Sequence, residues 1–472
     1  MSKKICIRFK IGKTQLINMK KLCFIALMLL FTISYNSNAQ ETTVNEKITE
    51  VNDKLAGLAE RLATTESDLS KLNKIKVSGY IQAQYQNFEN PAIQPDNYFS
   101  LRRVRVKFTY ETTDGVKFVL CPDFTPGNFV IKDAYAVLND HWTKAFSLWM
   151  GKFNRPNYEV EYSSSQREVV ERSLIIRTLY PGERTIGAKL EYNPMNVPIH
   201  IQFALLNGAD GLTISNSSGT NLNSSENKDF DNLKDIMVRA YYNLSLGNLG
   251  GIDFGAHGYF GSLKSNALKT LSSDYATIKD VKIGDAVKRN WIGGEVQFFV
   301  DWLGGTSIKA EYIAGKNASI GYAPVAASGT TAATPGVANF QNKFSGYYIY
   351  LIKNLGKKNQ FAMRYDYYDP NTNISGKDVA ITKYTSPDAA ALKSRISGKS
   401  DLATGTLSLA LHHYFDDNLR ISLNYDIVRN EKVGTANAVT ESYTNNDGTK
   451  GTLDYSNVIN QNLLTLRIQA KF

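Results

Sequence analysis

The sequence predicts an all-β protein, a 16-stranded antiparallel transmembrane β-barrel preceded by an N-terminal periplasmic coiled-coil helix. Sixteen segments of about ten residues alternate apolar and polar side chains, and roughly 9 to 11 tilted residues is the length at which a strand crosses hydrocarbon. The connections alternate between short turns and long polar loops, which is typical of outer-membrane barrels. The final segment keeps the alternation to its last residue, as expected of a strand that closes the sheet.

Residues 1–39 read as a cleaved secretory signal peptide. A charged stretch, Met19–Lys21, precedes an apolar run, Leu22–Ile33, and the small residues Ser37–Ala39 form a cleavage site. A membrane anchor is the alternative, but the apolar run is shorter than the roughly 20 residues that a spanning helix needs. Residues 1–18 look like an upstream extension of this signal.

The signal peptide also distorts the charge and cysteine content of the chain. Residues 1–39 carry seven of the 54 basic residues and no acid, so the rest has 54 − 7 = 47 basic against 44 acidic residues, a net charge of +3 instead of +10. This small excess gives no reason to expect nucleic-acid binding. Cys6 and Cys23 leave with the signal peptide, so Cys121 remains alone and no disulfide within one chain is expected.

Residues 40–74 are expected to form a coiled coil. Apolar residues recur at alternating spacings of four and three, which is the heptad pattern of such a helix. The predicted core residues are Ile48, Val51, Leu55, Leu58, Leu62, Leu69 and Leu72. Leucine at three of the four a positions favours a trimer or a higher oligomer over a parallel dimer. The alternative is a single amphipathic helix that lies on its own domain.

Residues 75–472 are expected to form the barrel. On the second strand Val104, Val106 and Phe108 share one face, while Arg103 and Arg105 share the other. The predicted strands are Lys76–Tyr85, Leu101–Glu111, Val116–Asp123, Lys132–Leu138, Phe146–Phe153, Arg184–Tyr192, Ile199–Leu206, Ile236–Tyr242, Ile252–Phe260, Trp291–Trp302, Ser307–Gly315, Phe344–Ile352, Phe361–Tyr368, Thr406–Phe415, Leu419–Val428 and Leu464–Phe472.

Strands that return to the periplasm are expected to end on outward aromatic residues, which would form an interfacial girdle. The predicted members are Tyr110, Tyr192, Tyr242, Trp302, Phe415 and Phe472. A soluble β-sandwich also alternates, but it has no reason to place aromatic residues at one end of alternate strands. Phe472 is also the expected recognition signal for the outer-membrane assembly machinery.

Three classes of function are compatible with such a barrel. The lumen of sixteen strands is too wide for side chains to fill, so a water-filled channel is favoured. A barrel enzyme would need a positioned histidine, but no G-x-S-x-G or His-Glu-x-x-His spacing occurs, and His412 and His413 point to opposite faces. An adhesin or cell-wall tether would use the coil and the loops. No cofactor or metal is indicated.

The segment between the fifth and sixth strands, within Gly151–Leu190, is rich in both charges. Its arginines are Arg155, Arg167, Arg172, Arg177 and Arg184, and its glutamates are Glu159, Glu161, Glu168, Glu171 and Glu183. A segment of this charge is either solvated outside the barrel or folded inward to narrow the channel.

Four stretches of the chain resemble the phosphate-selective porin O and P family: LRRVRVKFTYE (Leu101–Glu111), IKDAYAVLN (Ile131–Asn139), GKFNRP (Gly151–Pro156) and VERSLI…PGERTIGAKL. The resemblance implies a trimeric sixteen-stranded porin in which inward basic residues guide anions past a folded third loop. By motif position it implies a basic strand with Arg102, Arg103, Arg105 and Lys107, and a constriction loop with Arg155, Arg167 and Arg172. The other candidate pore-lining residues are Arg177, Lys189 and Arg239.

Two interpretations of the ion selectivity stay open. Arg103, Arg105 and Lys107 would face water and favour small anions, possibly phosphate, while Arg102 has outward parity and is expected to reach the headgroups. Alternatively, carboxylates pair with the arginines and leave a general, weakly selective pore; by parity these are Glu191, Glu295, Glu311 and Asp366. The expected setting is the outer membrane of a Gram-negative bacterium, with its lipid and the assembly machinery as partners of a homotrimer.

Overall fold

The computed structural model describes residues 41–90, 92–93, 97–112, 115–127, 129–156, 161, 163–208, 213–215, 221–223, 231–301, 304–324, 336–379, 397–434, 439–444 and 448–472. The predicted signal peptide lies outside these residues. The chain divides into two compact units between Lys74 and Ile75, and each is described by itself.

The first unit contains one long helix, α2 (Glu41–Asn73). Four of the predicted coiled-coil residues have described side chains, and all are exposed: Val51 54%, Leu55 60%, Leu58 61% and Leu62 60%. The side chains of Ile48, Leu69 and Leu72 lie outside the described part. Among the described residues, no helix has both the length and the apolar character to cross a bilayer. The apolar stripe of α2 therefore has no cover within its own chain over the described turns.

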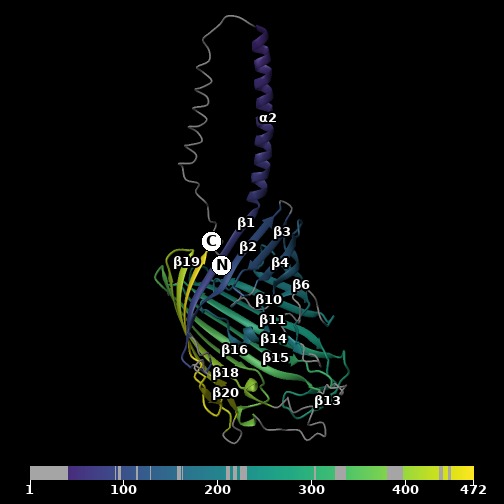
Figure 1. Ribbon diagram of the computed structural model, residues 1–472, viewed down its shortest axis with the longest axis vertical. Coiled ribbons are helices and arrows are strands. Elements are labelled where there is room, and N and C mark those ends of the chain that lie inside the picture. The colour runs from purple at the N-terminus through teal and green to yellow at the C-terminus, as the bar shows by residue number, and fades with distance from the viewer. Residues whose placement is uncertain are drawn as a thin grey trace. The chain divides into compact units, whose positions relative to one another are not determined.

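The second unit is a closed antiparallel barrel of sixteen strands (Figure 1). The main sheet holds eighteen strands, of which β12 and β13 form a hairpin outside the wall. The wall strands are β1 (Ile75–Phe88), β2 (Tyr98–Glu111), β3 (Val116–Asp123), β4 (Val130–Asn139), β5 (Phe146–Asn154), β6 (Arg184–Tyr192), β7 (Ile199–Leu206), β10 (Asp235–Ser245), β11 (Gly250–Lys264), β14 (Ala286–Val300), β15 (Thr306–Ser319), β16 (Asn339–Leu355), β17 (Asn359–Asp369), β18 (Thr404–Tyr414), β19 (Leu419–Asn430) and β22 (Leu463–Lys471).

Each predicted strand corresponds to one wall strand, so the predicted barrel is confirmed. Several strands run further than the alternation of the sequence indicated; β16, for example, begins at Asn339 instead of Phe344. The alternation ends where one face no longer meets lipid, but the backbone hydrogen bonds of the ladder continue beyond that level. Hydrophobic periodicity therefore marks the apolar belt rather than the full strand.

The barrel closes between the first and the last strand. β1 pairs with β22 from Tyr80↔Lys471 to Phe88↔Leu463. Gly79 and Phe472 exchange both backbone hydrogen bonds, at 2.9 and 3.0 Å. Phe472 itself therefore belongs to the seam, which is our name for the pairing of β1 with β22. The closed ladder leaves no unpaired edge at this point.

The seam contains a tight glycine position. A Cβ atom on Gly79 would lie 2.5 Å from the backbone oxygen of Arg105 and 2.6 Å from the ring of Phe472. Glycine lets the aromatic ring of Phe472 cover the backbone of β1, where any other residue would push the ring or the neighbouring strand away.

We expect Gly79→Ala to lower the yield of folded barrel clearly, since the added methyl collides with the backbone of β2 as well as with Phe472. Deletion of Phe472 should act in the same direction, because it removes the ring and two seam hydrogen bonds. Heat-modifiable gel mobility measures the folded fraction. Gly398→Ala is the matched control, because nothing lies within 4 Å of its Cβ position. Equal yields for the two glycine variants would contradict the assigned role of the seam.

The two faces of the wall differ as the alternation predicts. On β2, Phe108 is 40% exposed on the outside, whereas Arg103 and Arg105 on the inside are only 2% and 6% exposed. Three predicted girdle residues contact an aromatic neighbour: Tyr110–Phe118 and Tyr242–Phe254 are stacked, and Phe146–Tyr192 is tilted. Phe415 and Phe472 are exposed, and Trp302 lies outside the described residues.

The long loops carry three hairpins, β8–β9 (Thr213–Ser215, Asn221–Asn223), β12–β13 (Lys269–Leu271, Ile278–Asp280) and β20–β21 (Thr440–Thr444, Lys450–Asp454). Several loops share an apolar cluster that includes Leu271, Phe340, Ile374, Leu402 and Val433. Buried Asp401 ties two of them together, because it accepts hydrogen bonds from Tyr275 at 2.9 Å and from Asn371 at 2.8 Å.

Candidate functional site

The described residues of the connection between β5 and β6, 155–156, 161 and 163–183, fold into the barrel; we call them the inner loop. It contains a short helix, α3 (Leu174–Leu179), whose Ile175, Ile176 and Leu179 are at most 1% exposed. These side chains join one apolar cluster with lumen-facing residues of the wall, including Trp291, Tyr348 and Tyr350. The hydrophobic effect therefore holds the helix against one side of the lumen, and the inward alternative of the sequence analysis is the one observed.

Side chains of the wall also hold the inner loop through hydrogen bonds to its backbone carbonyl groups. Six of its carbonyl groups accept hydrogen bonds from side chains of the wall. The pairs are Gln82–Ser164 (3.1 Å), Gln469–Ser165 (2.9 Å), Arg420–Arg167 (3.2 Å), His412–Glu168 (2.6 Å), Arg467–Val170 (2.6 Å) and Arg364–Glu171 (2.6 Å). The donors come from β1, β17, β18, β19 and β22, so the loop reaches the wall on the far side of the seam. Each bond satisfies a carbonyl that would otherwise be buried without a partner.

Glu161 is the central anchor of the inner loop. Its carboxylate is fully buried and lies 3.0 Å from Arg364, which also pairs with Asp366 at 3.0 Å. The same carboxylate accepts hydrogen bonds from the backbone and the hydroxyl of Ser173, at 2.9 and 2.8 Å, and from the hydroxyl of Tyr350. A buried charge with this many donors is compensated, and it would be costly to leave unpaired.

Glu171 joins the inner loop to the seam. Arg102 makes two hydrogen bonds to it, at 2.9 and 3.0 Å, and Arg467 pairs with it at 2.6 Å. Burial alone would raise the pKa of the Glu171 carboxyl, but Arg102, Arg467 and Arg103 outweigh burial and hold its pKa well below the ordinary 4.5. The carboxylate therefore remains charged in the neutral and mildly acidic range.

The sign of this shift predicts how the channel responds to acid. Because the pKa of the Glu171 carboxyl is lower in the docked loop than in the undocked loop, ionised Glu171 stabilises docking. This stabilisation is complete above the pKa of the undocked carboxyl, and it is lost as the pH falls through the pKa of the docked carboxyl. We expect constant single-channel conductance from about pH 8 to about pH 5, and a change only below about pH 4. Glu171→Gln should remove part of the acid response. A conductance change that begins near about pH 6 would contradict this assignment.

Arg102 does not point outward, so its predicted contact with headgroups is wrong. The register of β1 and β2 shifts between Gln82 and Ala83, which pair with Arg103 and Leu101 and leave Arg102 as the extra residue of a bulge. A bulge can turn two consecutive side chains to one face, which strict alternation forbids. The two adjacent arginines in the sequence were the available signal, because they break the alternation.

Most of the predicted pore-lining cations are already paired. On the wall, Arg105 lies 2.7 Å from Asp123, Lys189 lies 2.6 Å from Glu191, and Arg239 lies 2.8 Å from Glu295. Lys189 also lies over the Trp149 ring at 3.7 Å, and Arg239 over the Tyr241 ring at 4.1 Å. Arg103 donates to the side chain of Gln82 at 2.8 Å. The lumen carboxylates thus neutralise much of the predicted basic face.

The predicted arginines of the inner loop have different surroundings. Arg172 pairs with Glu183 and donates to the backbone oxygen of Glu161 at 2.7 Å. Arg155 is buried, with its guanidinium 5.9 Å from the ring centre of Tyr180. Arg167 is 4% exposed, and its guanidinium nitrogens have no hydrogen-bond partner among the described residues. Arg177, at the last turn of α3, is exposed.

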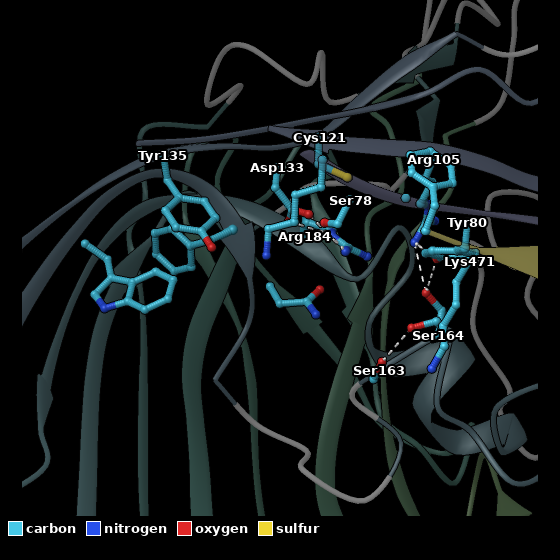
Figure 2. A pocket seen from close by; sticks show the side chains of 17 residues that line it. Ser78, Tyr80, Arg105, Cys121, Asp133, Tyr135, Ser163, Ser164, Arg184 and Lys471 are labelled. Atoms are coloured by element: carbon cyan, nitrogen blue, oxygen red, sulfur yellow. Dashed lines mark hydrogen bonds and ion pairs between the residues drawn. The ribbon is translucent and has the colours of Figure 1, made fainter. Parts of the chain in front are cut away.

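A cavity lies between the inner loop and β1–β6. Its volume is about 310 Å³, and Figure 2 shows Ser163 and Ser164 of the loop on one side of it. Four cationic side chains line it, Arg105, Lys107, Arg184 and Lys471, against the single carboxylate Asp133. Lys107 and Lys471 make no ion pair with any described residue, so the cavity carries an excess of positive charge.

Sequence reasoning missed most of the residues that position the inner loop. The alternation does predict which of these side chains face the lumen; they are Gln82, His412, Arg420, Arg467 and Gln469. Their partners could not be predicted, because a backbone carbonyl leaves no mark in the sequence.

The comparisons agree with this architecture. The family model described as phosphate-selective porin O and P matches residues 75–455. The solved structure of OprB from Pseudomonas putida is 10% identical, covers 87% of this chain and 97% of its own, and superposes with a TM-score of 0.53. An anion-selective porin from Comamonas acidovorans is 12% identical, with 84% and 99% of the chains covered and a TM-score of 0.49. No curated protein gives a significant match.

Proposed function

Because the chain belongs to the phosphate-selective porin O and P family, matched over residues 75–455, we propose that it conducts small anionic solutes, with phosphate among them. The protein is an outer-membrane porin, and the proposal concerns its solutes. The route is the cavity between the inner loop and β1–β6, which lies beside the apolar cluster through which α3 packs against Trp291, Tyr348 and Tyr350.

The excess positive charge of the cavity is the observation that supports anion preference. The charges of Arg105 and Arg184 are matched by Asp123 and Asp133, at 2.7 and 3.0 Å. Lys107 is not matched among the described residues, and it lines the cavity on the same face of β2 as Arg105. Basic side chains along a pore attract anions and repel cations, so we assign the preference mainly to Lys107.

A general, weakly selective pore is the second candidate. It is favoured by the number of cations that lie within hydrogen-bond distance of a carboxylate, which include Arg105, Arg172, Lys189 and Arg239. Paired charges largely cancel beyond a Debye length of about 8 Å at physiological salt. The two candidates differ in how strongly Lys107 and Lys471, the cavity lysines that make no ion pair with a described residue, bias the current.

We expect wild-type protein to be anion-selective in a planar bilayer with a potassium chloride gradient, and Lys107→Gln to lose most of that preference. Lys357→Gln is the control, since Lys357 lies in the exposed turn between β16 and β17. The same gradient in potassium phosphate tests whether phosphate passes. Cation selectivity in the wild type, or a Lys107→Gln variant with unchanged reversal potential, would reject this proposal.

We further propose that the porin is a homotrimer and that α2 forms a parallel three-stranded coiled coil in the periplasm. The proposal is supported by the exposed stripe of Val51, Leu55, Leu58 and Leu62, which needs apolar partners that its own chain does not supply over the described turns. Cleavage after residue 39 and recognition of Phe472 by the assembly machinery complete the proposed route to the outer membrane. Sequencing the amino terminus of protein purified from outer membranes tests the cleavage.

A further inference from the structure

We propose that the cavity is a binding site for ring-shaped, hydroxylated organic anions of monosaccharide size, such as sugar acids. The inference rests on the proposed function, because it concerns the solute of the same passage. Size is the first argument. At roughly 30 Å³ per water molecule, the cavity of about 310 Å³ holds about ten waters. A tetrahedral oxyanion would fill a small part of it, while this volume lies at the lower end of small-molecule sites, which begin near 300 Å³.

An aromatic wall is the second argument. Tyr135, Trp149 and Phe153 line the cavity and touch one another, with ring centres 4.8 Å apart for Tyr135–Trp149 and 6.4 Å apart for Tyr135–Phe153. In Figure 2, Tyr135 lies on one side, Arg184 lies between, and Arg105, Tyr80 and Lys471 lie on the other side. An inorganic anion gains nothing from aromatic carbon, whereas the apolar face of a sugar ring packs well against it.

The neutral polar groups of the cavity are the third argument. Asn154 lines it and is only 7% exposed, yet its side-chain oxygen has no hydrogen-bond partner among the described residues. An oxygen acceptor repels a carboxylate or a fully ionised phosphate, but it accepts a hydrogen bond from a hydroxyl group. The hydroxyls of Ser78, Ser163 and Ser164 lie in the same lining and can both donate and accept.

These three features assign the parts of the solute. The ring lies against Tyr135, its hydroxyls meet Asn154 and the serines, and its negative group lies near Lys107. A neutral sugar would lack the ion contact, and a short carboxylate such as acetate would lack the ring and the hydroxyls. A flat aromatic acid such as benzoate would lack the hydroxyls.

The test measures block of the chloride current by added solutes through the full-length channel in a planar bilayer. Glucuronate should halve the current at a concentration at least about tenfold lower than glucose, acetate or benzoate, as expected from one or two lost contacts per competitor. The half-blocking concentration is the solute concentration that halves the current. Tyr135→Leu should reduce the half-blocking concentration of acetate divided by that of glucuronate. Asn154→Leu should reduce the half-blocking concentration of benzoate divided by that of glucuronate. Tyr192→Leu, on the outer girdle, is the aromatic control and should leave both ratios unchanged.

The outcomes separate this inference from the proposed function. A channel without anion preference would reject the proposed function and, with it, the sugar-acid site. An anion-selective channel that glucuronate blocks no better than acetate would reject the site alone. Equal block by benzoate and glucuronate would also reject it, because the hydroxyl contacts would then contribute nothing. If Tyr135→Leu fails to fold, Asn154→Leu and Ser163→Ala provide the same comparison from the other lining groups.

Discussion

Glu161→Gln should release the inner loop and raise the single-channel conductance several-fold. The glutamine keeps the shape of the side chain but removes the charge that pairs with buried Arg364 at 3.0 Å. Breaking one partner of a buried ion pair costs about 3–5 kcal/mol. A cost of this size shifts the balance of docked and released loop by about two to four powers of ten. The released barrel then approaches the wide, water-filled lumen expected of sixteen strands.

Two further measurements make the loop experiment decisive. Glu168→Gln is the matched control, because the Glu168–Lys309 pair is more exposed, at 16% and 13% of the side chains, and should matter less. Cys121 lines the cavity and is only 5% exposed, so a small thiol reagent should modify it faster once the loop has moved. Unchanged conductance together with unchanged Cys121 reactivity in Glu161→Gln would show that this carboxylate does not hold the loop.

Leu62→Cys should cross-link two of the three subunits in most trimers under mild oxidation if α2 is a three-stranded coiled coil. In a parallel coil, residues at position a of neighbouring helices face one another, within the roughly 4.4–6.8 Å between Cα atoms that a disulfide spans. Glu60→Cys is the control, because by the predicted heptad it lies at position f, on the outside. Native Cys121 is 5% exposed and should not interfere.

The cross-linking result is read on a non-reducing gel with the full-length protein in mild detergent. We expect a strong dimer band for Leu62→Cys and little for Glu60→Cys. Equal weak bands for both variants, with the protein sedimenting as a monomer, would reject both the coil and the homotrimer. A trimer whose Leu62→Cys variant does not cross-link would reject the coil alone, and assign assembly to the barrel.

The alternation of the sequence predicted all sixteen wall strands because lipid imposes one apolar face on each of them. It failed where that constraint stops. The strand extension at Asn339 lies beyond the apolar belt, and the bulge at Arg102 depends on how β1 and β2 pair rather than on either strand alone. Alternation reports which environment each face meets, and register is a property of two strands together.

The candidate site was predictable in its charges but not in its contacts. Arg105 and Arg239 were correctly placed on the inner face, yet their pairing with Asp123 and Glu295 depends on which strands become neighbours. The prediction for this loop rested only on its charges, so the apolar contacts of Ile175 and Ile176 with the wall were not predicted. These residues become neighbours only when the barrel closes, so the sequence alone does not identify which of them pair.

The attachment of the inner loop through its backbone has a consequence for variation among porins of this architecture. Main-chain carbonyl oxygens of the loop accept hydrogen bonds from Gln82, Gln469, His412 and Arg467, and every amino acid supplies such an oxygen. The Ser164 hydroxyl also contacts the wall, since it lies 2.6 Å from the Tyr80 hydroxyl and accepts a hydrogen bond from Arg105 at 3.0 Å. The side chains of Ser163 and Ser165 can be exchanged without loss of the backbone attachment, while the solutes that the passage accepts would change. The wall and the loop can then diverge at different rates, so a shared scaffold can serve organisms that take up different nutrients.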